Sequence, residues 1–559
     1  MTISTIGVYS QSFSLYTQGN VTFKQMAIQS RLIGIEKTPS TTPEEALMPN
    51  SYIETGALNS KTKLIPLILG PALALALYFI LPDQYLDTTG NVAQFSHAGR
   101  ACIAIVLWMG IWWFTEAAPI AVTALLPIVL FPMLGIASSA NTLKHYASGT
   151  IFLFFGGFLI AGAIARWGLD RRIALLTIRL VGTKPQQIIL GILLATAFLS
   201  AWVSNTATAA MMLPIAIAVI NVVRTTRNSA PVDKQEHNFH VALLLSVAYG
   251  ASLGGVLTLI GTPPNGIFAR FVEQTYGDHV NFLDWMTISV PVVAVLTTLT
   301  YLMLVKILFR DQIEEIPGGR EWVTQELQNL GPMSRGEKIV LTVFVLTALT
   351  WTLGPVIRDL QINGTFPFKA LKDETIAMAA GILLFLIPID RQNGIHALDW
   401  ESASKAISWD VLLLFGGGLA MSAAIQSTGA SQVLGAQATA LINLPDWVWL
   451  TGITSLTTFV SEFTSNTALA ATMMPLVAAI SQSLNMHPEA MLIAATLGAS
   501  CAFMMPVGTP PNAMVFGTGR IRIGEMIRAG FWLNIVSIVV IVIMCLLFAG
   551  NLITSIQLN

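Results

Sequence analysis

Two polar tripeptides of identical sequence interrupt long apolar stretches of the chain, and their side chains could bind ions. Both read Ser-Asn-Thr: Ser204–Thr206 lies within the apolar stretch 187–223, and Ser465–Thr467 lies within 446–484. Hydroxyl and amide oxygens can coordinate a hard cation, while hydroxyl and amide hydrogens can bind an anion. We therefore expect each tripeptide to form part of a binding site inside the apolar region.

A second pair of identical sequences predicts two broken helices. Gly261–Asn265 and Gly508–Asn512 both read Gly-Thr-Pro-Pro-Asn. Proline lacks a backbone N–H and breaks a helix, but it suits the first position of the next helix. Each break therefore brings the C-terminus of one helix and the N-terminus of the next to the same point. Free carbonyls at the C-terminus favour a cation, and free N–H groups at the N-terminus favour an anion.

Three motifs recur in the same order, which indicates an internal duplication. Besides the two pairs above, Phe-Gly-Gly occurs at Phe155–Gly157 and again at Phe415–Gly417. Each Ser-Asn-Thr is followed by alanine, a Met-Met pair and a proline, Pro214 in the first copy and Pro475 in the second. The second member of each pair follows the first by about 250–260 residues. Three motifs repeated in the same order indicate duplication and not chance.

The composition is typical of a membrane protein. Of the 559 residues, 54% are hydrophobic and 11% are charged, and the mean hydropathy is +0.68. Soluble proteins carry about 25% charged residues. Apolar segments of about 20 residues, long enough to cross a bilayer, recur along the chain, whereas a β-barrel would show short alternating segments. The apolar segments run over 64–81, 101–115, 117–136, 148–167, 187–223, 239–275, 285–309, 338–357, 375–389, 409–428, 446–484, 489–517 and 530–549.

Two of these segments, 187–223 and 446–484, are too long for one crossing. As a straight helix, the first would be about 55 Å long. Because a polar tripeptide stands in the middle of each, we expect two re-entrant hairpins whose tips are those tripeptides. The remaining segments predict an all-α polytopic membrane protein with about eleven transmembrane helices plus the two hairpins.

The charge distribution predicts the topology. With the N-terminus in the cytoplasm and the C-terminus outside, 23 of the 29 lysines and arginines fall on the cytoplasmic side, as the positive-inside rule requires. Each copy of the repeat holds five crossings and one hairpin, and an odd number of crossings inverts the second copy. The predicted parts are a polar cytoplasmic tail without the apolar core of a signal peptide (1–63), a first transmembrane helix and loop (64–100), a first inverted repeat (101–310), a cytoplasmic linker (311–337) and a second inverted repeat (338–550). In inverted-repeat transporters the site lies between the repeats near the membrane midplane.

Several function classes are excluded by the residues present. The formal net charge of -1 gives no reason to expect nucleic acid, and no nucleotide-binding Gly-rich motif or intramembrane enzyme motif occurs. The three cysteines lie in apolar stretches and predict no disulfide framework. His237 and His240 lie in a polar segment before a helix, where we expect a solvated pair rather than a metal site.

The predicted bilayer interior contains no lysine or arginine, which limits how an anion could be held there. An anion near the midplane must rely on helix ends, hydroxyls, amides and co-bound cations. This constraint favours coupling to a cation such as Na⁺.

The paired Ser-Asn-Thr tips and the paired Thr-Pro-Pro-Asn breaks resemble the divalent anion–sodium symporter family, which carries di- and tricarboxylates and sulfate. The resemblance spans roughly residues 64–550 and implies that the two tips hold the substrate between them. The substrate-binding residues that it implies are Ser204, Asn205, Thr206, Ser465, Asn466 and Thr467, bordered by Thr262, Pro263, Thr509 and Pro510.

The same resemblance implies two sodium sites, a homodimer and an elevator motion of the hairpin-bearing part. The family's second sodium site commonly has threonine where this chain has Ser461, which still offers a hydroxyl oxygen. The implied ligands are Ser200, Ser204, Asn205 and Gly261 for one ion, and Ser461, Thr464, Asn466 and Gly508 for the other.

The leading functional hypothesis is sodium-coupled symport of a C4-dicarboxylate such as succinate, malate or fumarate across the plasma membrane. A sodium-independent dicarboxylate exchanger, a sulfate or citrate carrier, and a channel or arsenite-type efflux component remain as alternatives. Glu462 lies within the second hairpin, where we expect a structural hydrogen-bond acceptor in preference to a proton-sensitive or gating group.

The predicted topology can be tested by labelling single introduced cysteines with a membrane-impermeant thiol reagent. Asn228→Cys should react from the cytoplasmic side, because position 228 follows the first hairpin in a basic loop. The control Lys369→Cys should react in intact cells. Labelling of position 228 from outside the cell would contradict the topology.

Overall fold

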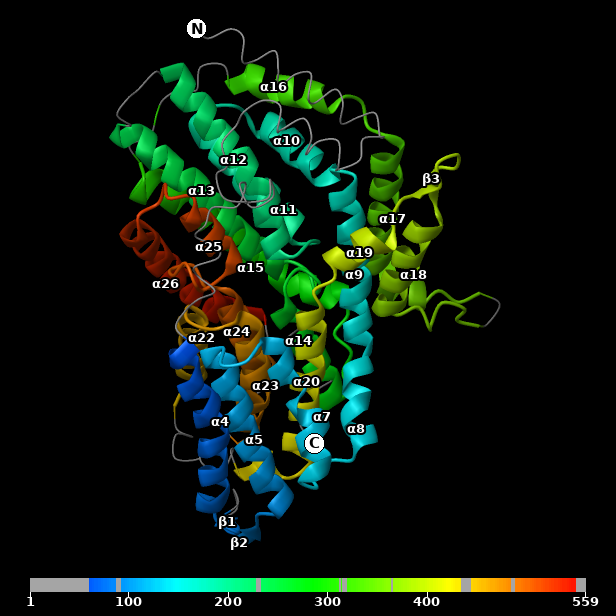
Figure 1. Ribbon diagram of the computed structural model, residues 1–559, viewed down its shortest axis with the longest axis vertical. Helices are drawn as coiled ribbons and strands as arrows, with labels where there is room; N and C mark the ends of the chain where they lie inside the picture. The colour runs from blue at the N-terminus through cyan, green and yellow to red at the C-terminus, as the bar shows by residue number, and fades with distance from the viewer. Residues whose placement is uncertain are drawn as a thin grey trace, which may run out of the picture. The chain divides into compact units, whose positions relative to one another are not determined.

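The structure is a computed structural model that describes residues 60–86, 92–227, 233–310, 313, 319–362, 365–433, 444–483 and 488–548. The chain divides into two compact units, Met1–Thr62 and Lys63–Asn559, and the predicted tail lies almost wholly outside the described residues. In the second unit the described residues form helices joined by short connections (Figure 1), which confirms the all-α prediction.

The first half of the described chain carries the first tip and the first break. Its elements are α4 (Ser60–Ile80), β1 (Gln84–Leu86), β2 (Val92–Gln94), α5 (His97–Thr115), α6 (Ile120–Ala124), α7 (Leu126–Met133), α8 (Ser139–Leu143), the 3₁₀ turn η2 (Lys144–Ala147), α9 (Gly149–Arg166), α10 (Leu169–Val181), α11 (Pro185–Ser200), α12 (Asn205–Arg227), α13 (Lys234–Val256), α14 (Pro263–Tyr276), α15 (Phe282–Leu302) and the π-helical η3 (Met303–Leu308).

The second half carries the second tip and the second break. Its elements are α16 (Gly319–Leu330), α17 (Arg335–Arg358), α18 (Asp373–Leu386), β3 (Pro388–Asp390), β4 (Ile395–His396), α19 (Trp400–Ala406), α20 (Trp409–Ser427), α22 (Asp446–Ser461), α23 (Asn466–Ser483), α24 (Pro488–Ser500), α25 (Pro510–Gly517) and α26 (Ile523–Phe548). The strands form two antiparallel pairs, β1 with β2 and β3 with β4.

Within the described residues, eight helices are long and apolar enough to cross a membrane. This number is below the eleven expected crossings partly because prolines split two of them: 117–136 becomes α6 and α7, with Pro127 at the start of α7, and 489–517 is split at the second break. Two further segments are short, since α18 has 14 residues and the apolar part of α4 covers only Leu64–Ile80. The segment 239–275 is split at the first break but still contributes α13. The eight include α12, the second arm of the first hairpin, whose 23 residues span about 35 Å and so exceed half a membrane.

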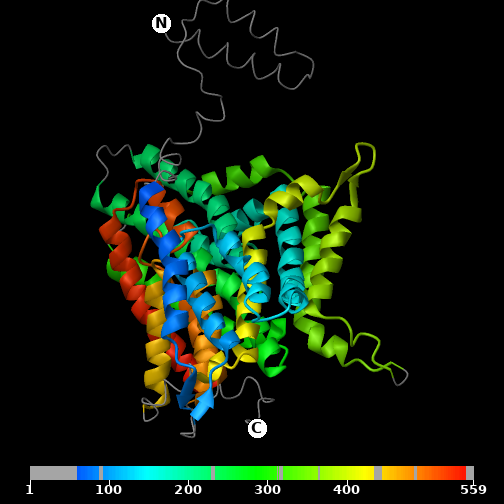
Figure 2. The same ribbon diagram turned by 60° about the horizontal axis from the view of Figure 1, so that its bottom comes forward.

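The two hairpins approach from opposite ends of the second unit. Figure 2 shows α16 (green) and the β3–β4 hairpin (yellow) at one end, and β1 and β2 (blue) at the other. The α12 helix packs against α16, and α23 packs against α5, which follows β2. The charge distribution predicts that these two ends lie on opposite sides of the membrane and that the end with α16 faces the cytoplasm, and both statements stay predictions.

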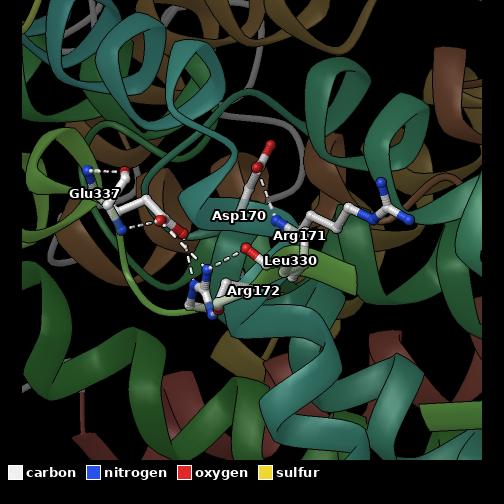
Figure 3. A network of polar contacts seen from close by, with 7 residues as sticks. Asp170, Arg171, Arg172, Leu330 and Glu337 are labelled. Carbon is white, nitrogen blue, oxygen red and sulfur yellow. Dashed lines mark hydrogen bonds and ion pairs between the residues drawn. The ribbon is translucent and has the colours of Figure 1, made fainter. Parts of the chain in front are cut away.

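A buried ion pair attaches α10 to the start of α17. Arg172 Nε lies 2.5 Å from Glu337 Oε1, and the two side chains are 10% and 7% exposed (Figure 3). The Arg172 guanidinium also donates to the carbonyl of Gly331 at 3.0 Å, while Glu337 accepts the Ser334 N–H at 2.7 Å and so caps α17. The neighbouring Arg171 makes a more exposed pair with Glu326 of α16 at 2.7 Å.

These two neighbouring pairs predict very different stability effects. Glu337→Ala should lower the free energy of unfolding by about 3–5 kcal/mol, because it leaves the Arg172 charge buried without its partner. Glu326→Ala should change it by about 0–1 kcal/mol, because solvent screens an exposed pair. Unfolding of the purified variants in detergent tests this; equal effects would mean that the Arg172 pair is not buried from solvent.

Candidate functional site

At the first tip, three oxygen atoms converge where α11 ends and α12 begins. The hydroxyl of Ser200, which is fully buried, lies 2.8 Å from Asn205 Oδ1 and 2.6 Å from the carbonyl of Ala251 in α13. The Ser204 hydroxyl accepts the Ala207 N–H at 3.3 Å and so caps α12. Because a hydroxyl has one proton, Ser200 cannot satisfy both acceptors at once.

The second tip repeats this arrangement. The hydroxyl of Ser461 lies 2.6 Å from Asn466 Oδ1 and 2.6 Å from the carbonyl of Ala499 in α24. Ser465 caps α23 by accepting the Ala468 N–H at 3.4 Å. Three converging oxygens of hydroxyl, amide and carbonyl type suit a hard cation. No group of three or more His, Cys, Asp or Glu side chains forms a metal centre in the described part of the chain.

Each break is closed by the asparagine of its Gly-Thr-Pro-Pro-Asn motif. Asn265 Nδ2 donates to the carbonyls of Gly255 at 3.0 Å and Thr258 at 2.7 Å. Asn512 Nδ2 donates to the carbonyls of Ala502 at 3.2 Å and Met505 at 3.0 Å. Both amides are fully buried, and within the described residues neither Oδ1 has a partner. Both residues belong to the Gly-Thr-Pro-Pro-Asn motif, but they are not among the predicted site residues.

The threonines before the prolines adopt nearly the same backbone conformation. Thr262 has φ −141° and ψ 142°, and Thr509 has φ −144° and ψ 150°. Both side chains are buried, while Pro263 is half-buried and Pro510 is exposed. The Thr509 hydroxyl accepts the Asn512 N–H at 3.3 Å, whereas Thr262 makes no such cap.

The first tip and the first break are in contact. A Cβ at Gly255 would lie 2.2 Å from Asn205 Oδ1, and a Cβ at Gly261 would lie 2.5 Å from the carbonyl of Gly255. The Thr258 hydroxyl donates to the carbonyl of Ala201 in the tip. Glycine at 255 thus allows the end of α13 to approach the predicted sodium ligand Asn205, and glycine at 261 allows the break to fold back against the Gly255 carbonyl.

The second tip meets its break through Glu462. The α24–α25 break is longer than the α13–α14 break, and Glu462 accepts the backbone N–H groups of Phe503, Met504 and Met505 at 2.8, 2.9 and 2.8 Å. Its Oε1 also accepts from Asn534 Nδ2 at 2.6 Å. A Cβ at Gly508 would lie 3.0 Å from Glu462 Oε2. These contacts support the structural interpretation of Glu462.

The two halves of the described chain pack against each other through the second arms of the hairpins. The α12 helix, which begins at the first tip, packs against α25, and α23, which begins at the second, packs against α14 (Figure 1). Tyr249 and Phe503 join the repeats by an edge-to-face contact with ring centroids 5.3 Å apart. Of the remaining predicted residues, Thr206 is exposed and Thr467 half-buried, while Thr464 donates to the carbonyl of Val460 at 3.1 Å.

The prediction of a solvated His237–His240 pair is wrong. His240 is 5% exposed, and His237 Nε2 lies 2.8 Å from Glu525 Oε1 of α26. Both histidines lie in the first two turns of α13, and the contact of His237 with Glu525 of α26 is a long-range contact that the local sequence does not reveal.

Comparison with known proteins identifies the family. Residues 91–555 match the family model described as the sodium:sulfate symporter transmembrane region. The chain belongs to the divalent anion–sodium symporter family. Among its relatives, the sodium-dependent dicarboxylate transporter SdcS of Staphylococcus saprophyticus is 40% identical over 86% of this chain and 90% of its own length, and SdcS of Staphylococcus aureus is 38% identical over 87% and 91%.

Solved structures share the fold of this symporter-family chain at low sequence identity. The YdaH transporter of Alcanivorax borkumensis matches with a TM-score of 0.56 at 14% identity, covering 88% of this chain and 98% of its own. MtrF of Neisseria gonorrhoeae matches with a TM-score of 0.53 at 12% identity, covering 87% and 94%. Family membership establishes a multi-pass membrane transporter and not an enzyme.

The contacts of Glu462 predict a loss of stability when its charge is removed. Glu462→Gln should lower the free energy of unfolding by about 1–3 kcal/mol, because one carboxylate oxygen is replaced by an NH₂ group that faces backbone donors. The control Glu401→Gln removes a carboxylate whose pair with Lys405 is exposed, and it should have little effect. Unfolding in detergent compares the two, and a Glu462→Gln protein as stable as the wild type would contradict the structural role.

Proposed function

We propose that this protein is a sodium-coupled symporter of dicarboxylates. The observation that carries the proposal is the converging hydroxyl, amide and carbonyl oxygens, built once around Ser200 and again around Ser461. The two relatives named as sodium-dependent dicarboxylate transporters support the same conclusion.

One sodium ion would bind at each tip. A cation placed among the three oxygens would relieve their mutual repulsion, which the single Ser200 or Ser461 proton cannot do for both acceptors. The backbone of the neighbouring break lies close enough to contribute. The proposed ligands are Ser200, Ser204, Asn205 and Gly261 at the first site, and Ser461, Thr464, Asn466 and Gly508 at the second.

The dianion would bind between the two tips. Helices α12 and α23 begin at the two tips, α14 and α25 begin at the two breaks, and helix N-termini favour negative charge. Sodium ions behind the tips would supply the positive charge that side chains do not. The proposed substrate contacts are Ser204, Asn205, Thr206, Ser465, Asn466 and Thr467, with Thr262, Pro263, Thr509 and Pro510 at the border.

Within this function we infer a C4-dicarboxylate such as succinate, malate or fumarate as the substrate. The alternatives are a sulfate or citrate carrier, favoured by the description of the family model, and a sodium-independent exchanger. We further propose a plasma-membrane homodimer with its N-terminus in the cytoplasm. The inverted repeats 101–310 and 338–550 would then move the hairpins by an elevator motion.

Uptake of radiolabelled succinate into proteoliposomes tests the proposal. An inward sodium gradient should drive it, with a dependence on sodium concentration steeper than first order. Two sodium ions per dianion are electroneutral, whereas three carry one positive charge and gain about 2.3 kcal/mol per 100 mV. We expect the second case and hence faster uptake at inside-negative potential. Uptake that needs internal dicarboxylate and no sodium would establish the exchanger instead.

Serine-to-alanine variants locate the sodium ions in the same assay. Ser200→Ala and Ser461→Ala should each weaken the apparent sodium affinity about tenfold, a loss of about 1.4 kcal/mol. Ser246→Ala is the matched control, because its buried hydroxyl donates to the Leu243 carbonyl at 2.7 Å within α13. An unchanged sodium dependence in both test variants would remove the tips from the sodium sites.

A further inference from the structure

The first tip carries a tryptophan that reaches into the second repeat. Trp202 lies between Ser200 and Ser204, in the short non-helical segment that separates α11 from α12. Its ring stacks on Phe282 of α15, with centroids 5.9 Å apart and planes at 16°. It also meets Phe344 of α17 edge-on at 5.1 Å and lies parallel to Trp351 of α17 at 6.4 Å.

Two of the rings that contact Trp202 are fixed by further stacking and hydrogen bonds. Phe282 and Trp351 stack at 4.7 Å with planes at 10°, and both are almost fully buried. Asp373, at the start of α18, accepts the Phe282 backbone N–H at 2.9 Å through Oδ2 and the Trp351 indole N–H at 3.0 Å through its carbonyl. The cluster therefore joins the first tip to α15, α17 and α18.

The second tip has an aromatic residue at the matching position but no such cluster. Phe463 lies between Ser461 and Ser465, as Trp202 lies between Ser200 and Ser204. Its side chain is 62% exposed, and it makes no ring contact with the described residues. The two tips thus carry aromatic residues at equivalent positions, but only Trp202 packs against other rings among the described residues.

We propose that Trp202 is a positioning residue that sets the sodium affinity of the first tip. This inference rests on the function proposed above. The Ala201 and Val203 N–H groups donate to the carbonyls of Ala197 and Leu199 and so extend the last turn of α11 toward the tip. The Ser200 and Asn205 oxygens beside this turn must face the Ala251 carbonyl to receive a cation. The ring contacts of Trp202 hold that segment against α15 and α17, since paired aromatic rings stabilise beyond the area that they bury.

The ring and not the indole N–H carries this role. The Trp202 Nε1 is buried and has no acceptor among the described residues. Phenylalanine at this position would keep ring contacts with Phe282 and Phe344 and would remove an unsatisfied donor. Trp202→Phe should therefore retain function, whereas Trp202→Ala should not.

The experiment measures sodium affinity in two ways on Trp202→Ala, Trp202→Phe and the control Phe463→Ala. The first readout is the rise of the unfolding temperature with sodium concentration in detergent, which requires no transport. The second is the sodium dependence of succinate uptake into proteoliposomes. Trp202→Ala should weaken the apparent sodium affinity about tenfold in both. The apparent sodium affinity of Trp202→Phe and of Phe463→Ala should stay within about twofold of the wild-type value. A tenfold loss corresponds to about 1.4 kcal/mol.

Three results would overturn the inference: a wild-type sodium dependence in Trp202→Ala, an equal loss in Phe463→Ala, or no recovery in Trp202→Phe. If Trp202→Ala fails to fold, Phe344→Leu removes the edge-on ring from the α17 side and should weaken sodium affinity in the same direction. Failure of the proposed function has a different signature, because the wild type itself would then take up succinate without regard to sodium.

Discussion

The architecture of the site depends on backbone groups that are freed when helices break inside a membrane. Each interruption leaves N–H and C=O groups without helical partners, and lipid offers them no water. Buried side chains supply the missing hydrogen-bond partners. Asn265 and Asn512 donate to carbonyls of the two breaks, and Glu462 accepts three N–H groups of the longer break. The backbone that remains is fixed in place, so its polar groups and the nearby hydroxyls present a preformed surface to ions.

The two copies agree where ions are expected to bind and differ in how that arrangement is supported. The Ser200 and Ser461 hydroxyls have the same two kinds of acceptor at nearly the same distances. The supports around them are unrelated, with a carboxylate behind the second tip and an aromatic cluster beside the first. This difference fits an inverted repeat, because the two copies face different neighbours even when their local geometry is the same.

Much of this organisation could be predicted from the sequence, because the breaks are marked by local chemistry. Ser-Asn-Thr and Thr-Pro-Pro-Asn located both tips and both breaks, and the hairpin arms begin and end close to the expected positions. The division of 117–136 into α6 and α7 was missed, although Pro127 signals it. The Ala251 and Ala499 carbonyls, the burial of His240 and the docking of Trp202 could not be predicted, because each is a contact between segments far apart in the chain. Every residue has a backbone carbonyl, so the sequence does not show which carbonyl will face a binding site.

The paired glycines of α13 bear on how the first hairpin could move. Added Cβ atoms at Gly254 and Gly255 would lie 2.2 Å from the Ala197 carbonyl and 2.2 Å from Asn205 Oδ1, so α13 meets the first arm of the hairpin backbone to backbone and the second arm at the Asn205 side chain. Surfaces this close cannot slide past each other without separating, since packed interiors have little free volume. We therefore expect the first hairpin and α13 to move as one rigid body. A flap-like opening of the hairpin alone would require all of its close contacts with α13 to separate.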